Sequence, residues 1–215
     1  MITESLLGTD FLIKNAKEIQ VVIDNNAPEI EKLDQEIGDG DHIFNIQRGI
    51  KLVIELEPII KHLSMSKALN QIAMKILSGI GGSSGALFGT LFMTMAKVSN
   101  IDDGIDYKKA INMFVDGVEA VKQRGKADVG EKTMMDVLIP VANCLKQGIE
   151  NDKDLKDLMR EAIETAEKGM LSTKDLLATK GRASFLGDRS KGHIDPGARS
   201  SQLMIKTVCM SILNT

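Results

Sequence analysis

The residues best suited to chemistry form an acidic cluster of three aspartates, Asp34, Asp39 and Asp41. Asp39 and Asp41 are separated by one glycine, so in an extended loop both side chains leave the backbone on the same side. Carboxylates this close repel one another unless a positive charge lies between them. Their hard oxygens suit Mg²⁺ or Ca²⁺ and do not suit zinc or copper, although the spacing is not that of an EF-hand. The alternative interpretation is a polar turn in which Gly38 ends one helix and Asp41 caps the next.

A second segment, residues 78–85, is rich in glycine and serine and runs into the apolar stretch 86–98, which is expected to be helical. Glycines let backbone amides approach a ligand closely, and a helix N-terminus adds unpaired N–H groups and a dipole that favours phosphate. The segment is neither a Walker A loop nor a Rossmann fingerprint following a strand. It predicts a phosphate contact or, alternatively, a close-packed turn between two helices.

Two charged loops complete the set of candidate segments. Residues 124–136 form a charged loop that enters another helix, and residues 180–198 form a long polar loop closed by Pro196, which is placed to begin the final helix. A long loop without secondary structure inside a compact domain is usually functional or disordered, and this mixture of residues favours function. Arg182 could bind phosphate as a fork-shaped donor, or it could pair with Asp188 on the surface.

The elements that must position these segments are expected to be helices. Apolar residues recur at spacings of three and four in residues 68–77, 107–121 and 155–166, and no convincing alternating strand is found. The last helix, about residues 197–213, is apolar on most sides and is expected to be central. This pattern predicts an all-α single domain of antiparallel helices joined by short connections.

Composition narrows the class of protein. A chain of 215 residues is long enough for one large domain with a proper core. The formal net charge of −3 offers no electrostatic surface for nucleic acid or for an anionic membrane. Cys144 and Cys209 lie in apolar helical contexts and predict a reducing, cytoplasmic compartment. No signal peptide is recognised at residues 1–5, and the longest apolar stretch is too short to cross a bilayer.

With these four segments in view, the chain resembles the nucleotide-binding (L) subunits of the phosphotransferase-dependent dihydroxyacetone kinases. The resemblance covers essentially the whole chain and rests on four stretches in the family's order: LDQEIGDGDH, GGSSGALFGT, RGKADVGEKTMMD and KGRASFLGDRSKGHIDPGARSS. It implies that residues 1–215 form a single nucleotide-binding domain. The implied fold is a closed bundle of about eight antiparallel helices that holds the nucleotide at one end.

The resemblance also implies roles for individual residues. Asp34, Asp39 and Asp41 are expected to hold two Mg²⁺ ions, which bridge the carboxylates to the phosphates of ADP or ATP. The expected nucleotide contacts are His42, Ile43, Phe44, Asn45, Ser83, Ser84, Gly125, Met134, Arg182, Asp195, Pro196 and Gly197. The family usually has a small residue, most often glycine, at position 43, and proline is common at position 129. The alternative role of His42 is that of a hydrogen-bonded histidine capping a helix.

The implied function is that of half an active site. MgADP would stay bound as a coenzyme and be rephosphorylated in place by a phosphohistidine (M) protein of the phosphotransferase system. The phosphoryl group would then pass to dihydroxyacetone on the K subunit, whose own histidine bonds to the substrate, so no catalytic residue is expected here. A homodimer is possible. The alternatives are a regulatory module that senses nucleotide state, and the nucleotide domain of a kinase for another substrate such as a fatty acid.

Overall fold

The computed structural model describes residues 7–99 and 105–215 of the chain. Within these ranges it contains α-helices, one 3₁₀ segment and no strand, so the all-α prediction is confirmed. The helices are α1 (Thr9–Asn25), α2 (Ala27–Ile37), α3 (His42–Glu55), α4 (Glu57–Ile60), α5 (Met65–Gly79), α6 (Gly82–Val98), α7 (Tyr107–Gly125), α8 (Met135–Glu150), α9 (Leu155–Ser172) and α10 (Pro196–Leu213), with the 3₁₀ segment η1 (Arg182–Ser190) between the last two.

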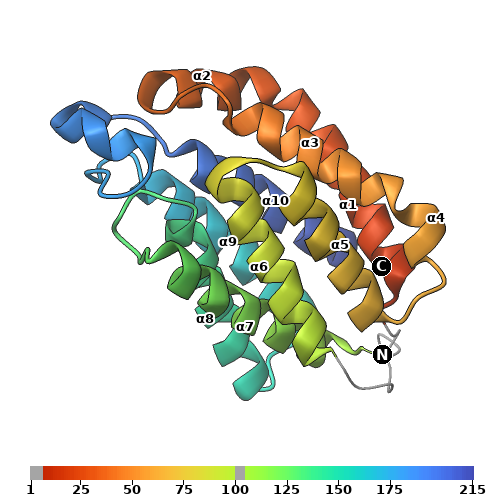
Figure 1. Cartoon of the computed structure of the whole chain (residues 1–215). Coiled ribbons are helices and arrows are strands. Elements are labelled where there is room, and N and C mark those ends of the chain that lie inside the picture. Colours follow the sequence, from red (N-terminus) through yellow and green to blue (C-terminus); the bar gives the residue numbers. More distant parts are fainter. Residues whose placement is uncertain (1–6, 100–104) are drawn as a thin grey trace.

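Eight of these helices form a closed ring (Figure 1). Going round it, α1 packs on α3, α3 on α5, and each helix from α5 to α9 packs on the next, until α10 packs back on α1. Neighbours in the ring run in opposite directions. The predicted closed bundle of about eight antiparallel helices is therefore confirmed, with the short helices α2 and α4 and segment η1 added outside the ring.

The predicted helical periodicity matches the buried faces of the ring. In α5, Ala68, Leu69 and Ile72 are almost fully buried, and in α9 the same holds for Leu158 and Ala162. Because each helix carries such a stripe, burial of the stripes against two neighbours stabilises the closed arrangement. Of the helices in the described ranges, none is both long and apolar enough to cross a membrane.

The last helix packs on α1, α2, α8 and α9, but it is one of the eight members of the ring and is no more central than α3, which packs on five other elements. The expectation that α10 is apolar on most sides is wrong for its first two turns, where Ser200, Ser201 and Gln202 are buried. Gln202 donates a hydrogen bond to Glu167 and accepts one from Arg199, both at 2.7 Å, and Ser200 donates to the Gly197 carbonyl at 3.1 Å. Ser201 instead faces the apolar cavity of the ring, and its hydroxyl has no partner in the described part of the chain. Apart from Ser201, the beginning of α10 thus lies in a polar part of the bundle.

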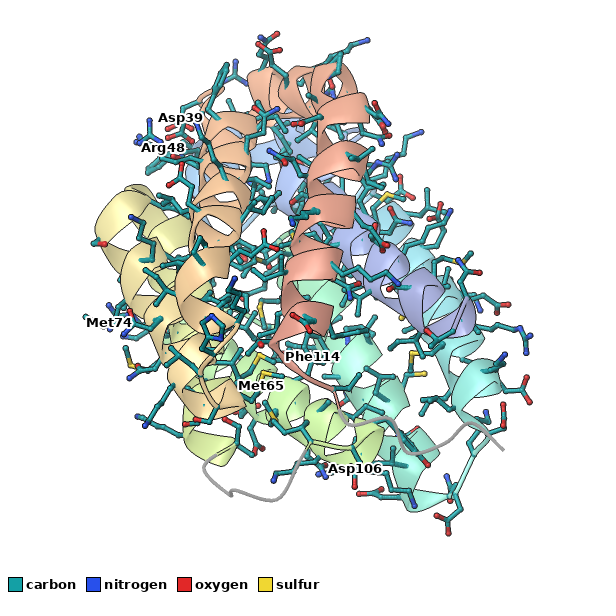
Figure 2. The ribbon with its side chains drawn as sticks, turned by 90° about the vertical axis from the view of Figure 1, so that its right-hand side faces the viewer. Asp39, Arg48, Met65, Met74, Asp106 and Phe114 are labelled. Atoms are coloured by element: carbon teal, nitrogen blue, oxygen red, sulfur yellow. The ribbon has the colours of Figure 1, made fainter. Side chains whose placement is uncertain are left out.

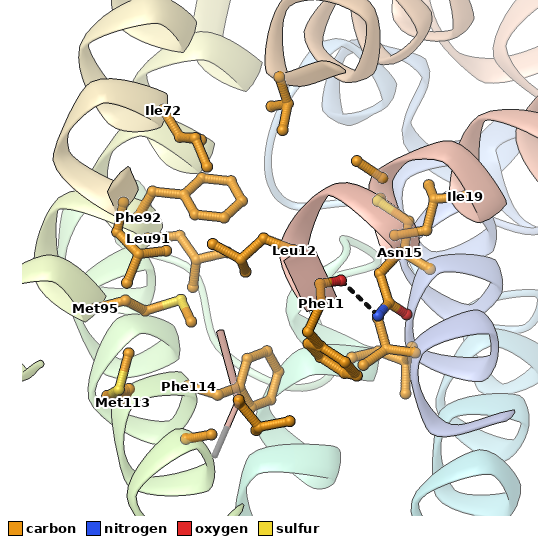
Figure 3. Close-up of a pocket in the computed structure, with 18 of the residues that line it drawn as sticks. Phe11, Leu12, Asn15, Ile19, Ile72, Leu91, Phe92, Met95, Met113 and Phe114 are labelled. Atoms are coloured by element: carbon orange, nitrogen blue, oxygen red, sulfur yellow. Dashed lines mark hydrogen bonds between the residues drawn. The ribbon is translucent and has the colours of Figure 1, made fainter. Parts of the chain in front are cut away.

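The ring encloses an apolar cavity of about 360 Å³ (Figure 3). Phe11, Phe92 and Phe114 line it, together with leucine, isoleucine and methionine side chains. The Asn15 amide nitrogen donates a hydrogen bond to the Phe11 carbonyl at 2.9 Å, whereas the Asn15 Oδ1 is buried at the wall without a hydrogen-bond partner among the described residues. Side chains from eight helices therefore leave the centre of the ring incompletely filled.

The long loop after α9 is more ordered than predicted. Residues 182–190 form the 3₁₀ segment η1, interrupted at Gly187, whose φ of 55° is in the left-handed region. Hydroxyl groups supply the missing partners: Ser184 donates to the carbonyl of Gly181 at 2.7 Å, and Ser190 donates to that of Gly187 at 2.8 Å. Local hydrogen bonds of this kind, from side chain to backbone, stabilise tight turns. Apolar periodicity does not predict such turns.

Candidate functional site

The four segments singled out from the sequence lie together at one end of the ring (Figure 1). Helices α3, α6, α8 and α10 begin at this end, and α1, α5, α7 and α9 end there. In the second view, Asp39 marks this end and Asp106, the N-cap of α7, marks the opposite one (Figure 2). The beginnings of helices carry unpaired N–H groups and a partial positive charge, so their convergence favours an anion.

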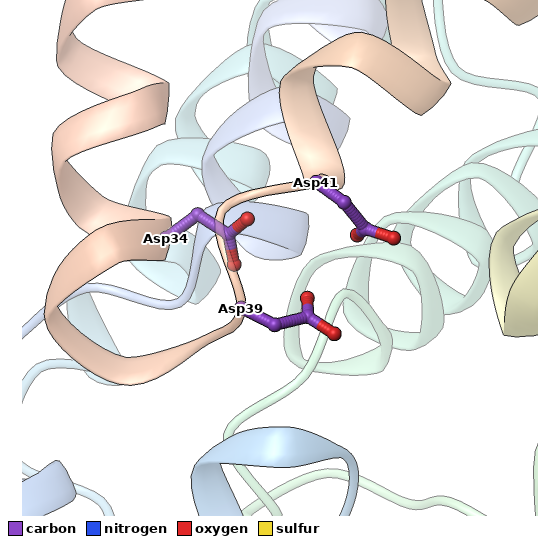
Figure 4. A group of neighbouring side chains, drawn as sticks. All are labelled: Asp34, Asp39 and Asp41. Atoms are coloured by element: carbon purple, nitrogen blue, oxygen red, sulfur yellow. The ribbon is translucent and has the colours of Figure 1, made fainter.

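The acidic cluster is compact (Figure 4). One carboxylate oxygen from each of Asp34, Asp39 and Asp41 lies within 4.8 Å of the other two. Asp34 is only 4% exposed, whereas Asp39 and Asp41 are exposed to solvent. Three hard oxygen donors, two of them open to solvent, fit a divalent cation such as Mg²⁺ that also keeps water or phosphate oxygens in its shell.

The turn between α2 and α3 explains how the cluster is built. Gly38 ends α2, and the Asp34 carboxylate crosses the turn to accept a hydrogen bond from the His42 backbone N–H at 2.9 Å. Asp41 occupies the N-cap position of α3, but its side chain makes no capping bond. The polar-turn interpretation is thus correct for the backbone, while Asp34 caps α3 and leaves the Asp41 carboxylate available for a ligand.

Gly38 is required by this arrangement, because a Cβ atom there would collide with Oδ1 of Asp34. We expect Gly38→Ala to lower the free energy of unfolding by about 1–3 kcal/mol, since the carboxylate must move and give up its bond to His42. Urea denaturation measures this change. Gln35→Ala, an exposed change on the same helix, is the control and should stay within about 0.5 kcal/mol of the unmodified chain. Equal stabilities of the two variants would contradict the prediction.

Arg182, on η1, reaches across to the acidic cluster. Its Nε lies 2.9 Å from Oδ2 of Asp39, and its side chain is 72% exposed. The alternative pairing with Asp188 is wrong, because Asp188 pairs with Lys191 at 2.8 Å. An exposed ion pair contributes little stability, so the guanidinium can exchange Asp39 for another anion without much cost to the fold.

His42 joins α3 to α10. Its Nε2 lies 2.9 Å from Oγ of Ser200, and burial lowers the pKa of the imidazole although Asp34 and Asp41 act to raise it. His42 is therefore hydrogen-bonded, as the alternative interpretation held, but its ring bonds to the Ser200 hydroxyl, and it is Asp34 that accepts the backbone N–H at the start of α3. The position of His42 brings the acidic cluster next to the beginning of α10, which carries the predicted contacts Pro196 and Gly197.

The three residues after His42 differ in what they can offer a ligand. Ile43 is 2% exposed and packs among Ile23 and Ile30, so its side chain faces the core and only its backbone could contact a nucleotide. Phe44 is 58% exposed, and Asn45 is partly buried. The expectation that Ile43 contacts nucleotide is therefore limited to its backbone.

Ser83 and Ser84 lie in the first turn of α6, where backbone N–H groups have no partner within the helix. Two different constraints explain why glycine occupies the positions on either side of these serines. A Cβ at Gly85 would collide with the Ile80 carbonyl, so that glycine serves close packing. Nothing lies within 4 Å of the corresponding position at Gly82, whose φ is +68°. The segment is thus both a packed turn and an open helix beginning.

The remaining predicted contacts come from three further elements. Gly125 ends α7, and Met134 occupies the N-cap position of α8. A Cβ built on Gly197 would lie 3.5 Å from the Cβ of Met134, so these two positions are neighbours. The Asp195 carboxylate caps α10 by accepting a hydrogen bond from Ala198 at 2.7 Å, and burial raises its pKa to about 7.

Sequence reasoning assigned no role to two buried charged residues at this end. Lys132 and Asp136 are each 1% exposed. Asp136 accepts hydrogen bonds from the backbone N–H groups of Gly130 at 2.6 Å and Thr133 at 2.8 Å. Both residues stand in a charged stretch, where lysine and aspartate are normally exposed. The only feature of the sequence that pointed to a role for them was their place inside one of the four motifs.

Comparison with known proteins places the chain in a family. The model of the DAK2 domain matches residues 36–210. The ADP-binding subunit of the PEP-dependent dihydroxyacetone kinase of Escherichia coli is 40% identical over 83% of this chain and 85% of its own length. The ADP-binding subunit of the PTS-dependent dihydroxyacetone kinase of Lactococcus lactis is 36% identical over 94% of this chain and 97% of its own.

A solved structure shares the fold. The crystal structure of the dihydroxyacetone kinase from C. freundii in complex with AMP-PNP and Mg²⁺ superposes with a TM-score of 0.72 at 19% identity. The match covers 98% of this chain and 36% of that longer one. With these matches, the chain belongs to the DAK2 domain family, alongside the ADP-binding subunits of bacterial dihydroxyacetone kinases.

Proposed function

We propose that this chain is the ADP/ATP-binding subunit of a dihydroxyacetone kinase and that it holds MgADP as a coenzyme. The observation that carries the proposal is the triangle of aspartates, with oxygens within 4.8 Å of one another, beside the guanidinium of Arg182 and the beginnings of four helices. Negative ligand atoms, a positive side chain and helix N-termini in one place fit a nucleotide whose phosphates are bridged to protein by metal. The names of the relatives support the same assignment.

Within this proposal, Asp34, Asp39 and Asp41 would hold two Mg²⁺ ions, which supply charge neutralisation and Lewis acidity when bound. Arg182 would exchange Asp39 for a phosphate oxygen. The first turn of α6, with Ser83 and Ser84, donates hydrogen bonds to phosphate. Phosphoryl transfer needs positioning and charge neutralisation more than covalent chemistry, and these residues supply both.

The nucleoside part is assigned to the beginnings of α8 and α10 at the same end. Met134 and Gly197 are neighbours there, and a flexible thioether packs well against a purine face. Gly125, Asp195 and Pro196 are assigned to the same part of the ligand, whereas His42, the backbone of Ile43, Phe44 and Asn45 are assigned to its phosphate end. We propose that residues 1–215 act as this one nucleotide-binding domain.

The proposed nucleotide site implies two partner proteins. We assign dihydroxyacetone to a K subunit and rephosphorylation of ADP to the phosphohistidine (M) protein of the phosphotransferase system. A cytoplasmic location agrees with the free thiols of Cys144 and Cys209, which form no disulfide in the described ranges. A regulatory module that senses nucleotide state would use the same site for binding but would not transfer phosphate.

Thermal unfolding tests nucleotide binding. A ligand that binds only the native state adds about 2.7 kcal/mol of stability at a hundredfold excess over Kd, so we expect MgADP to raise the Tm by roughly 5–10 °C. EDTA should reverse the gain, because the carboxylates and phosphates then repel each other. The measurement is differential scanning calorimetry of nucleotide-free protein. An unchanged Tm with MgADP would count against a nucleotide site.

A further inference from the structure

A buried ammonium group lies beside the proposed nucleoside site. Lys132 is 1% exposed and belongs to the connection between α7 and α8. Its Nζ donates hydrogen bonds to the backbone carbonyls of Thr173, at the end of α9, and His193, just before α10. The side chain therefore joins the α7–α8 connection to both ends of the α9–α10 connection.

A second hydrogen bond, this time to Thr173, also holds the segment before α10. The backbone N–H of Asp195 donates a hydrogen bond to Oγ1 of Thr173 at 3.0 Å, and Thr173 is fully buried. Residues 193–195 are thus held through two consecutive links, one to Lys132 and one to Thr173. These links fix the point from which α10 begins, and with it Pro196 and Gly197.

Lys132 is itself held rigidly. Its φ is 60°, in the left-handed region of backbone conformation that residues other than glycine rarely adopt. The neighbouring backbone N–H of Thr133 donates to the buried carboxylate of Asp136, which stabilises this conformation. The same connection carries Met134, two residues on, which is the neighbour of Gly197. Lys132 therefore connects the two neighbouring positions, Met134 and Gly197, to which the nucleoside is assigned.

Stability alone is a weak reason to bury a lysine. Burial lowers its pKa, against the attraction of Asp195, Asp136 and Asp175. Apolar residues of similar volume often replace buried charges with no loss of stability. A fully buried ammonium bonded to two backbone carbonyls is better explained by the geometry that it imposes on them.

We propose that Lys132 is a positioning residue that sets residues 193–197 against Met134 and so determines affinity for the nucleoside part of the ligand. This inference rests on the proposed function, because it presumes that MgADP binds at this end. The metal and phosphate part is assigned to the acidic cluster and the first turn of α6, and the side-chain hydrogen bonds of Lys132 go to neither of them. Loss of Lys132 should therefore weaken recognition of the nucleoside and spare recognition of the phosphates.

Calorimetric titration with two probes tests the separation. We expect Lys132→Met to raise the Kd for MgADP about tenfold or more, and to leave the Kd for magnesium pyrophosphate, which has no nucleoside, within about threefold. Lys122→Met is the matched control, because Lys122 pairs with the exposed Asp128 on the outside of the same connection. It should change neither constant by more than about threefold.

A second pair of variants keeps the test decisive if Lys132→Met does not fold. Thr173→Val removes the hydroxyl that accepts from Asp195 at nearly constant volume, and Thr173→Ser retains it. The valine variant should lose MgADP affinity selectively, and the serine variant should recover it. Equal losses for both probes, or no loss for MgADP, would overturn the positioning role. Failure of the unmodified chain to bind MgADP would instead overturn the proposed function.

Discussion

Asp39→Ala and Asp41→Ala are each expected to abolish Mg²⁺-dependent ADP binding while leaving the helix content unchanged. Each change removes one of three carboxylates whose oxygens lie within 4.8 Å of one another, and it removes charge that the metal needs. Both residues are exposed, so the fold does not depend on them. We expect affinity to fall about 100-fold or more, measured by calorimetric titration of MgADP, with circular dichroism as the check on folding.

Two further variants give this prediction its controls. Asp34→Asn should weaken binding less than the alanine changes, because an amide oxygen can still coordinate metal and still accept the hydrogen bond from His42. Asp188→Ala removes an exposed aspartate of η1 that pairs only with Lys191 among the described residues, and it should leave binding unchanged. If Asp39→Ala or Asp41→Ala binds ADP with the same Mg²⁺ dependence as the unmodified chain, the assignment of these residues as metal ligands is wrong.

The isolated chain is expected to form no dihydroxyacetone phosphate from ATP, Mg²⁺ and dihydroxyacetone. Every residue assigned at the nucleotide end handles metal, phosphate, nucleoside or backbone geometry, and none is assigned to a three-carbon ketone. Addition of a K subunit should raise the rate by more than about 10³-fold, because it places the substrate next to the phosphoryl group. A coupled assay of dihydroxyacetone phosphate, with and without the K subunit, measures the difference.

The same assay separates the competing functions. We expect the K subunit to dock against residues 182–195, where the Phe185 side chain is 84% exposed. With both subunits present, Asp41→Ala should give no product. Robust turnover by the isolated chain would overturn the subunit assignment. Nucleotide binding without transfer, in a complete system with the K subunit, the M protein and phosphoenolpyruvate, would favour the regulatory module.

The sequence by itself predicted the class of fold and the parts of the site. Apolar spacing in α5 and α9 indicated helices because a helix must turn one face to the core, and that constraint is local. The aspartate spacing around Gly38 and the glycines before α6 predicted ligand-binding segments, because clustered carboxylates suit a divalent cation and a glycine-rich helix beginning suits phosphate. Because neighbouring helices of the ring run in opposite directions, every second connection lies at the same end of the bundle. The four motifs stand in such connections and therefore meet at that end.

The tertiary structure alone decided which side chains face the ligand and which face the core. Ile43 lies in a motif yet packs in the interior, and Arg182 pairs with Asp39 instead of Asp188. Lys132 is a charged residue in a charged stretch, and only its burial against the carbonyls of Thr173 and His193 distinguishes it. These outcomes depend on contacts between residues far apart in the chain, and local spacing carries no information about such contacts.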